Sequence, residues 1–295
     1  MLPNFLVIGA PKAGTTSLFY YLDQHPEVYM CPMKEVGFFW AYGGFQPKGP
    51  GNERLRNRVI SDQARYEALF QGVKDEKAIG EASVRYLASP NSPELIRRFI
   101  PGAKLIVSLR QPADRAFSAF VHNLTDGVEP CTDFAEALEQ EKQGQREGWT
   151  QARYFQNGRY ATSLKRYLEY FDRGQLHISL FEDLRDEPLS LMSDIYTFLG
   201  VRADFKPDTT HRYNVSGLIR NPLLRVLWAR LSKLRAAVRP FFSPRARYQV
   251  AEWVMQDTVK PKFSPELRVE LTEYYRDEIE QLQELLQRDL SAWLK

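Results

Sequence analysis

The stretch Phe5–Leu22 constrains this 295-residue chain more than any other. A short, β-branched apolar run is followed by the loop Gly9-Ala-Pro-Lys-Ala-Gly14, and an amphipathic segment begins at Thr15. A strand, a tight loop and a helix start in this order favour anion binding, because the first amide groups of a helix lack internal partners and its dipole attracts negative charge. Lys12 adds a positive charge to the loop. The alternative is a Gly/Pro turn that only joins strand to helix.

The spacing of Gly9 and Gly14 matches the nucleotide-triphosphate loop Gly-x-x-x-x-Gly-Lys-Ser/Thr, but one position departs from it. Thr15 stands where that motif has its lysine, and the lysine of this chain lies inside the loop at position 12. A nucleotide kinase would need the lysine after Gly14 and a bridging magnesium ion. The loop therefore favours a phosphate ligand other than a simple triphosphate.

Strand and helix patterns alternate along the chain, which predicts a three-layer α/β, P-loop-like fold with a mostly parallel central sheet flanked by helices. Ligands of such sheets bind at the carboxyl ends of the strands, where residues 9–17, 35, 81–86 and 110–118 should converge. Residues 41–58 have no periodicity and are interpreted as a surface excursion near the site. The expected strands are 4–9, 28–30, 77–81, 104–109 and 176–181, and the expected helices are 15–24, 61–70, 93–99, 134–143, 159–171, 189–199 and 264–290, with one more from Pro112.

Composition places the chain among globular proteins, with 43% hydrophobic and 26% charged residues. We expect a single domain over 1–295, in which 206–295 forms a helical, basic lid and a C-terminal helix region. A net charge of +3 does not indicate a nucleic-acid partner. Two cysteines fit a reducing compartment, and no apolar run approaches the roughly 20 residues of a membrane span, so a cytoplasmic protein is expected.

The stretch 206–247 holds ten Lys or Arg residues and one acid, Asp208. It is interpreted either as a solvated helix face or as a lid that attracts an anionic cofactor or polymer. Peripheral contact of this stretch with a membrane surface is the related partner hypothesis.

A second motif runs from Leu105 to Ser118, with an apolar strand, Arg110 at its end and Ser118 eight residues further on in the next helix. Arg110 supplies a forked charge suited to phosphate. Taken alone, the motif is also compatible with an arginine paired to Asp114 and a serine bonded to its own helix. Together with the first loop it resembles the sulfotransferases that use 3′-phosphoadenosine 5′-phosphosulfate (PAPS).

The resemblance implies which residues hold the cofactor. The segment Pro11-Lys-Ala-Gly-Thr-Thr-Ser17 is similar to the family's 5′-phosphosulfate loop, and Leu105–Ser118 to its 3′-phosphate motif. His211–Gly217, followed by Arg220, resembles a late segment that covers the 3′-phosphate. The cofactor-binding residues implied are Lys12, Ala13, Gly14, Thr15, Thr16, Ser17, Arg110, Ser118 and Arg220.

The same resemblance implies the catalytic groups. Lys34-Glu-Val-Gly-Phe-Phe39 is similar to the Glu-Val-His-Phe-Phe segment of heparan-sulfate sulfotransferases, which makes Glu35 the base. Gly37 replaces their histidine. Lys12 would stabilise the departing bridging oxygen. The alternative for Glu35 is a surface partner of Lys34.

Other polar residues receive weaker assignments. Gly80-Glu-Ala-Ser83 aligns with a Glu-Lys-Thr-Pro segment whose assisting lysine is Ala82 here. Glu81 is a second base candidate or a buried carboxylate, and Ser83 is assigned to the site wall. Tyr160 is assigned to a substrate or cofactor contact or to the core. Arg115 and His122 are assigned structural or surface roles.

The sequence thus predicts a PAPS-dependent sulfotransferase that acts on a hydroxyl or amine, with a carbohydrate hydroxyl preferred, and releases adenosine 3′,5′-bisphosphate (PAP). The scattered histidines and cysteines indicate no metal site. The acceptor is expected to be a glycan or a small molecule. A non-catalytic P-loop-like module that binds an anionic glycan, and a nucleotide kinase, are the alternatives.

Overall fold

The computed structural model describes residues 1–42, 44, 47–211, 218–219, 258–259 and 261–295. Its centre is a five-stranded sheet in the order β2-β3-β1-β4-β5, and every strand pair in it is parallel. This confirms the predicted α/β class. The strands are β1 Phe5–Gly9, β2 Val28–Met30, β3 Ala78–Ala82, β4 Lys104–Leu109 and β5 Leu176–Leu180.

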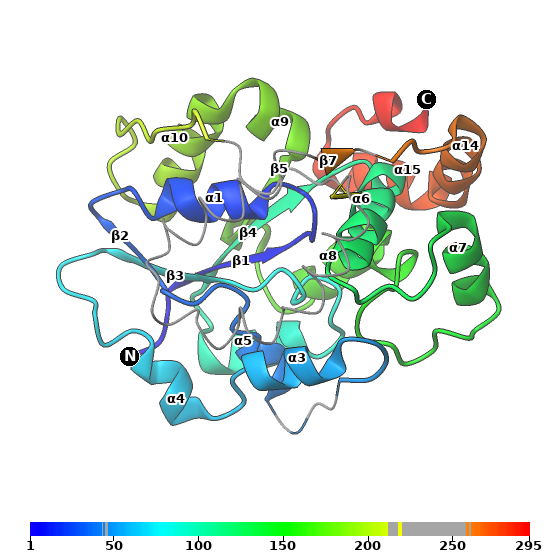
Figure 1. The fold of residues 1–295 in the computed structure, drawn as a ribbon. Coiled ribbons are helices and arrows are strands. Elements are labelled where there is room, and N and C mark those ends of the chain that lie inside the picture. Colours follow the sequence, from blue (N-terminus) through cyan, green and yellow to red (C-terminus); the bar gives the residue numbers. More distant parts are fainter. Residues whose placement is uncertain (43, 45–46, 212–217, 220–257, 260) are drawn as a thin grey trace.

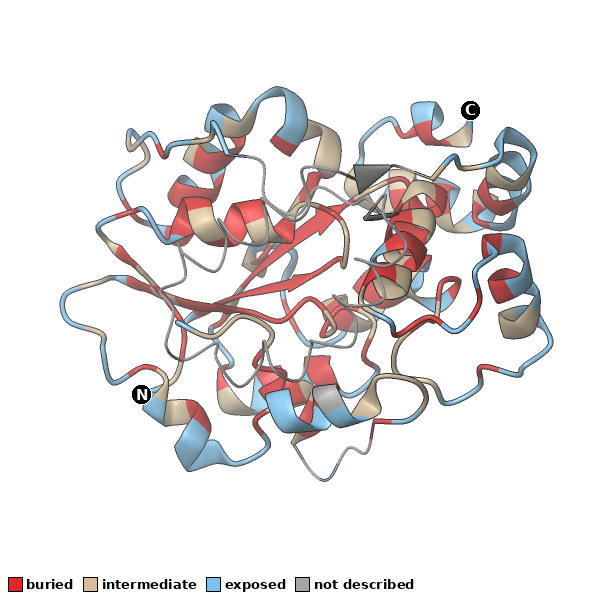
Figure 2. Cartoon of the chain, in the orientation of Figure 1, coloured by how far each residue is buried: buried red, intermediate tan, exposed pale blue. Residues whose placement is uncertain are grey.

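Both faces of the sheet are buried, and alternate residues of one strand enter different cores (Figure 2). On β1, Leu6 and Ile8 pack into the larger core, whereas Phe5 and Val7 pack into the smaller one. This alternation follows from the two-residue period of a strand and explains the continuous apolar run. The sheet is therefore the middle of three layers.

Three helices cover one face of the sheet and a larger group covers the other (Figure 1). The first group is α1 Thr15–Leu22, α9 Phe181–Asp186 and α10 Pro188–Leu199. The larger core draws side chains from α2 Phe38–Ala41, α4 Gln63–Ala68, α5 Ser92–Phe99, α6 Pro112–Thr125, α7 Phe134–Lys142, α8 Tyr160–Leu168, α14 Pro265–Tyr274 and α15 Arg276–Leu286. The remaining elements are α3 Asn52–Arg58, the short helices Gln156–Gly158, Arg173–Gln175 and Ser291–Leu294, and the antiparallel pair β6 Leu218–Ile219 and β7 Thr258–Val259.

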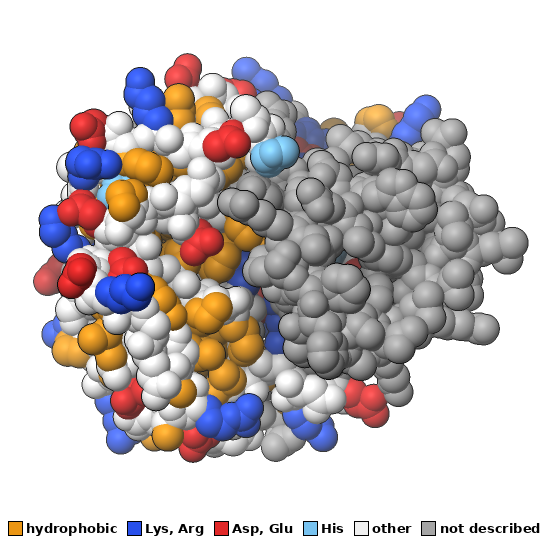
Figure 3. All heavy atoms as spheres, turned by 60° about the vertical axis from the view of Figure 1, so that its left-hand side comes forward, with side chains coloured by type: hydrophobic (Ala, Val, Ile, Leu, Met, Phe, Trp, Pro, Cys, Tyr) orange, Lys and Arg blue, Asp and Glu red, His pale blue; other side chains and the backbone are white. Residues whose placement is uncertain are grey.

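Local capping explains where several helices begin. The Asp62 carboxylate accepts the Arg65 amide at 2.8 Å at the start of α4, and α6 begins with Pro112, a favoured first-turn residue. Between these helices the chain returns to the sheet as parallel strands. The loop after each strand therefore lies at the carboxyl edge of the sheet. On the face shown in Figure 3, charged side chains of both signs lie between hydrophobic ones.

Three expectations about the elements were wrong. The stretch 41–58 is not wholly irregular, because α3 begins after Gly51, whose positive φ of 74° suits glycine. The long helix expected over 264–290 is two helices that break at Tyr275, whose hydroxyl donates to the carbonyls of Tyr154 and Phe155. The short helix α9, directly after β5, was missed.

Candidate functional site

A cleft of about 890 Å³ lies at the carboxyl edge of the sheet. Its walls come from the loop after β1, the segments after β2 and β3, one side of α6, and α9. These segments are far apart in the sequence and meet because parallel strands end at the same edge. Residues from each of the predicted segments 9–17, 35, 81–86 and 110–118 line this cleft, although Glu81 and Ser83 do not.

The loop between β1 and α1 is tied to the neighbouring strand by Ser108 of β4. The Ala10 amide donates to the Ser108 carbonyl at 2.7 Å, and the Ser108 hydroxyl donates to the Ala13 carbonyl at 2.6 Å. These two hydrogen bonds fix the position of the loop against β4. The helix that follows the loop, α1, has Gly14 as its N-cap residue and no side-chain cap. A helix start of this kind favours an anionic ligand.

Lys12 occupies the middle of this loop with a left-handed φ of 69° and lines the cleft. Among the described residues, no acceptor pairs with its ammonium group. Burial, together with the charges of Arg110 and Lys34 and against the opposing effect of Asp126, lowers the pKa of Lys12 to about 8. A desolvated cation of this kind favours an anionic ligand.

Arg110 ends β4 and forms a second positive wall of the cleft. Its guanidinium donates weakly to the Lys12 carbonyl at 3.4 Å and lies 5.0 Å from the centre of the Phe181 ring. The alternative partner, Asp114, is instead bound by Arg268 at 3.0 Å. In the part of the chain that the structure describes, no carboxylate is within ion-pair distance of Arg110.

Glu35 follows β2 and faces the same cleft, with its side chain 20% exposed. The Lys34 ammonium is 2.9 Å from its carboxylate. Burial raises the pKa of Glu35, but Lys34, Arg85 and Arg58 outweigh burial and lower it. Glu35 is therefore ionised at neutral pH and able to accept a proton. Both interpretations of Glu35, as a partner of Lys34 and as a cleft residue, agree with this geometry, because its carboxylate contacts Lys34 and the residue also lines the cleft.

Most of the predicted cofactor residues lie together. The cleft is lined by Lys12, Gly14, Thr15, Thr16, Ser17, Arg110 and Ser118. Ala13 is buried under the loop, where its amide donates to the Ala10 carbonyl at 3.2 Å. Arg220 lies outside the described residues, as do 212–217 and the rest of the basic stretch from 220 to 247.

Tyr160 is a buried core residue that contacts the backbone of Arg110. It is 2% exposed, and its hydroxyl donates to the Arg110 carbonyl at 3.0 Å. Tyr160 does not line the cleft. Its contact fixes the backbone at the end of β4, so it supports the position of Arg110.

The structural or surface roles expected for Arg115 and His122 agree with the structure, since Arg115 is buried and the His122 side chain is about half exposed, but both residues also line the cleft. The nearby positive charge of Lys12 lowers the pKa of His122 to about 4, against the opposing effect of Asp126, whose carboxylate is 3.8 Å away. Arg115 is fully buried and donates to the Tyr154 carbonyl. The signal for His122 was its spacing of four from Ser118, which places both on one side of α6.

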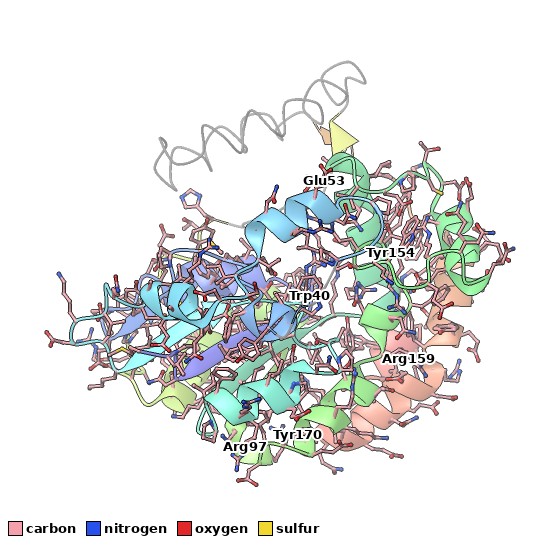
Figure 4. The ribbon with its side chains drawn as sticks, turned by 90° about the horizontal axis from the view of Figure 1, so that it is seen from below. Trp40, Glu53, Arg97, Tyr154, Arg159 and Tyr170 are labelled. Atoms are coloured by element: carbon pink, nitrogen blue, oxygen red, sulfur yellow. The ribbon has the colours of Figure 1, made fainter. Side chains whose placement is uncertain are left out.

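Glu81 and Ser83 are buried and do not line the cleft. The Ser83 hydroxyl donates to the Glu81 carboxylate at 2.8 Å. The assignment of Ser83 to the site wall was therefore wrong, and Glu81 has no direct path to an acceptor as a base. Arg85, from the same segment, does line the cleft. Its guanidinium carbon lies over the ring of Trp40, 5.9 Å from the ring centre (Trp40 is labelled in Figure 4).

Among the described residues, no group of three His, Cys, Asp or Glu side chains could hold a metal ion. No helix in the same residues is long and apolar enough to cross a membrane.

Residues 3–205 match the model of the sulfotransferase family. The chain is similar to a sulfotransferase from Alicyclobacillus acidocaldarius, with which it shares 34% sequence identity. Its structure matches the crystal structure of that protein with a TM-score of 0.78, and the match covers 100% of both chains.

Two curated relatives are longer proteins. The membrane-associated sulfotransferase kil1 of Dictyostelium discoideum is 25% identical over 70% of this chain and 58% of its own length. The bifunctional heparan sulfate N-deacetylase/N-sulfotransferase 4 of Mus musculus is 30% identical over 78% of this chain and 25% of its own. The chain thus matches a little over half of the first and a quarter of the second.

Proposed function

The chain belongs to the sulfotransferase family and is a sulfotransferase enzyme, and we propose that it moves the sulfuryl group of PAPS to a hydroxyl or amine acceptor. The observation that carries the choice of PAPS is the pair of cations, Lys12 and Arg110, that line one cleft without an anionic partner among the described residues. They belong to different strand ends. A ligand with phosphate groups at two separate positions would engage both.

We propose that the two ends of the cofactor bind different elements. The open first turn of α1 and Lys12 would hold the 5′-phosphosulfate, because helix amides and a nearby ammonium suit an anion. Arg110 and Ser118 would hold the 3′-phosphate, since the guanidinium fork matches phosphate oxygens. Arg220 is proposed as a further phosphate contact. PAPS supplies the sulfuryl group and the leaving phosphate oxygen.

The catalytic proposal assigns one residue to each side of the transferred group. Glu35 accepts the proton of the acceptor as its oxygen or nitrogen bonds to sulfur. The bond from sulfur to the bridging oxygen breaks, and its electron pair remains on the phosphate. Lys12 stabilises the charge that develops there. The lowered pKa of Glu35 and the lowered pKa of Lys12, about 8, leave both groups in the required forms at neutral pH.

We propose an anionic carbohydrate as the acceptor. Arg58 and Arg85 lie near Glu35, Arg153 lines the same cleft, and Asp126 is an acid facing Lys12. This excess of positive charge favours a sugar that carries a carboxylate or sulfate beside its reactive group. The name of the mouse relative, which refers to heparan sulfate, supports the carbohydrate class.

The test is sulfate transfer from PAPS to pooled acceptors, followed by mass spectrometry. The pools are neutral oligosaccharides, uronate-containing oligosaccharides, phenols and hydroxylated lipids, and the product expected is a sulfated uronate-containing sugar. Glu35→Gln should lower the rate by roughly 10²- to 10⁴-fold, the range typical of a general base, while PAP still binds. A wild-type rate in this variant would remove Glu35 from the mechanism. Preferred sulfation of a neutral acceptor would contradict the proposed acceptor class.

A further inference from the structure

The segment that carries Glu35 has a backbone that needs external support. Glu35 has a left-handed φ of 63°, and Gly37, two residues later, has a φ of 70°. A non-glycine residue in this region is strained and persists only where its surroundings fix it. At Gly37 a β-carbon would lie 2.1 Å from Val59, so the segment also packs closely. Something must hold residues 35–39 in this form.

Three hydrogen bonds tie residues 35–39 to the last residue of β3 and to the segment after it. The Glu35 amide donates to the Ala82 carbonyl at 2.8 Å. The Gly37 amide donates to the Ser83 hydroxyl at 2.9 Å. The Phe39 amide donates to the Tyr86 hydroxyl at 3.3 Å. Two of the three acceptors are thus side-chain hydroxyls, whose orientation is not fixed by the backbone.

Glu81 fixes the orientation of both hydroxyls. One of its carboxylate oxygens accepts from Ser83 at 2.8 Å and the other from Tyr86 at 2.7 Å. A hydroxyl has a single hydrogen, so a hydroxyl that donates to Glu81 turns its lone pairs toward the amide it must accept. The Tyr66 hydroxyl adds a longer contact at 3.4 Å. Glu81 is completely buried.

We propose that Glu81 is a positioning residue that holds Glu35 in its left-handed conformation through the hydroxyls of Ser83 and Tyr86. The inference rests on the proposed role of Glu35 as the base. This role explains why the fold buries the Glu81 carboxylate, although burying a charge is energetically unfavourable and no cation pairs with Glu81 within the described part of the chain. The relay works fully only while Glu81 is ionised, because a protonated carboxyl donates at one oxygen.

The charged and titratable groups around Glu81 make its protonation relevant near neutral pH. Burial and the charge of Glu35 raise the pKa of Glu81 to about 7, against the opposing bonds from Tyr86, Ser83 and Tyr66. The buried thiol of Cys31, which follows β2, also faces Glu81. Glu35 itself has a lowered pKa, so a kinetic transition near pH 7 would come from Glu81 rather than from the base.

Hydrogen exchange tests the holding role without relying on activity. In Glu81→Gln the amide group replaces one acceptor oxygen, so at least one hydroxyl loses its orientation. Exchange of the Gly37 and Phe39 amides should become roughly 10-fold faster or more, the range expected from one lost buried hydrogen bond. Unchanged exchange at both amides overturns the proposal.

Two further variants keep the test decisive if Glu81→Gln does not fold. Ser83→Ala should speed exchange at Gly37 more than at Phe39, and Tyr86→Phe should do the reverse. Equal effects of both variants on both amides would mean general loosening and would overturn the relay.

Kinetics tests whether the held conformation matters for transfer. Glu81→Gln should lower kcat roughly 10- to 100-fold, the effect of a misplaced catalytic group, and leave the Kd for PAP unchanged. The fall of kcat below pH 7 in the wild type should be absent in the variant. The matched control is Glu278→Gln, because the Glu278 carboxylate binds the Thr162 amide and Arg159, and none of these three residues lines the cleft.

The outcomes separate this inference from the proposed function. Full activity in Glu35→Gln would refute the base, while the exchange data would still decide whether Glu81 holds the segment. Accelerated exchange together with an unchanged kcat in Glu81→Gln would overturn the positioning role. The same loss of kcat in Glu278→Gln would reduce the effect to general instability and would also overturn it.

Discussion

Replacing Glu81 by Gln should remove a pH-dependent part of the free energy of unfolding. In the unfolded chain this carboxyl has its ordinary pKa of 4.5, and burial in the fold raises the pKa to about 7. The raised value means that the fold favours the protonated form. The contribution of Glu81 to stability is therefore complete below pH 4.5 and is lost as the pH rises through 7.

The magnitude follows from the two pKa values. Their difference corresponds to about 3 kcal/mol in total, of which about 2.5 kcal/mol falls between pH 5 and pH 8. No discount for solvent screening applies, because Glu81 is completely buried. Gln does not titrate, so between pH 5 and pH 8 the variant should gain about 2.5 kcal/mol relative to the wild type. Any effect of the substitution that does not depend on pH changes the stability of the variant equally at both pH values and cancels when the two are compared.

The assay is urea unfolding of both proteins at pH 5 and pH 8, with linear extrapolation. Other titrating groups contribute equally to both proteins and cancel in the difference. The stability of the variant relative to the wild type should therefore be about 2.5 kcal/mol more favourable at pH 8 than at pH 5. If the two proteins change in parallel, within about 0.5 kcal/mol, Glu81 does not titrate as the structure indicates and the reasoning from its burial is refuted.

Three further predictions address the site and the scaffold. Arg110→Ala should weaken PAP binding roughly 10- to 100-fold, because a charge-assisted bond to phosphate contributes about 1.5–3 kcal/mol; a change of less than twofold in calorimetry would contradict the assignment. The kcat/KM for PAPS should fall as the pH rises above about 8, since the free Lys12 ammonium loses its proton there, and Lys12→Arg should move this fall to higher pH; a fall at the same pH in both proteins would exclude Lys12 as its source. Arg146→Ala should destabilise the fold by about 3–5 kcal/mol in urea unfolding, because it leaves the buried Glu129 carboxylate unpaired; a loss below 1 kcal/mol would contradict this account of the pair.

The strand-and-loop core of the site was predictable from the sequence. Each strand of the sheet is an apolar run that stops at a polar residue, and parallel pairing brings those stops together. This is why Lys12, Glu35 and Arg110 were expected at one edge and do line one cleft. The expectation needed no knowledge of side-chain directions.

What the sequence did not reveal depends on side-chain direction and on long-range contacts. His122 lies one helical turn beyond Ser118, and only the packing of α6 shows that this side faces the cleft. Glu81 lies near the carboxyl end of β3, close to the cleft, but the pleat of β3 turns it into the core. The break at Tyr275 has no local breaker residue and depends on two distant carbonyls that its hydroxyl binds.

Calorimetric titration of PAP tests the central claim most directly. The account predicts saturable binding of PAP by the wild-type protein, weaker binding after Lys12→Ala or Arg110→Ala, and much weaker binding of ATP, which lacks the 3′-phosphate that Arg110 would engage. Absence of PAP binding, or equal binding of ATP, would contradict the claim that the cleft between these two cations is a PAPS site.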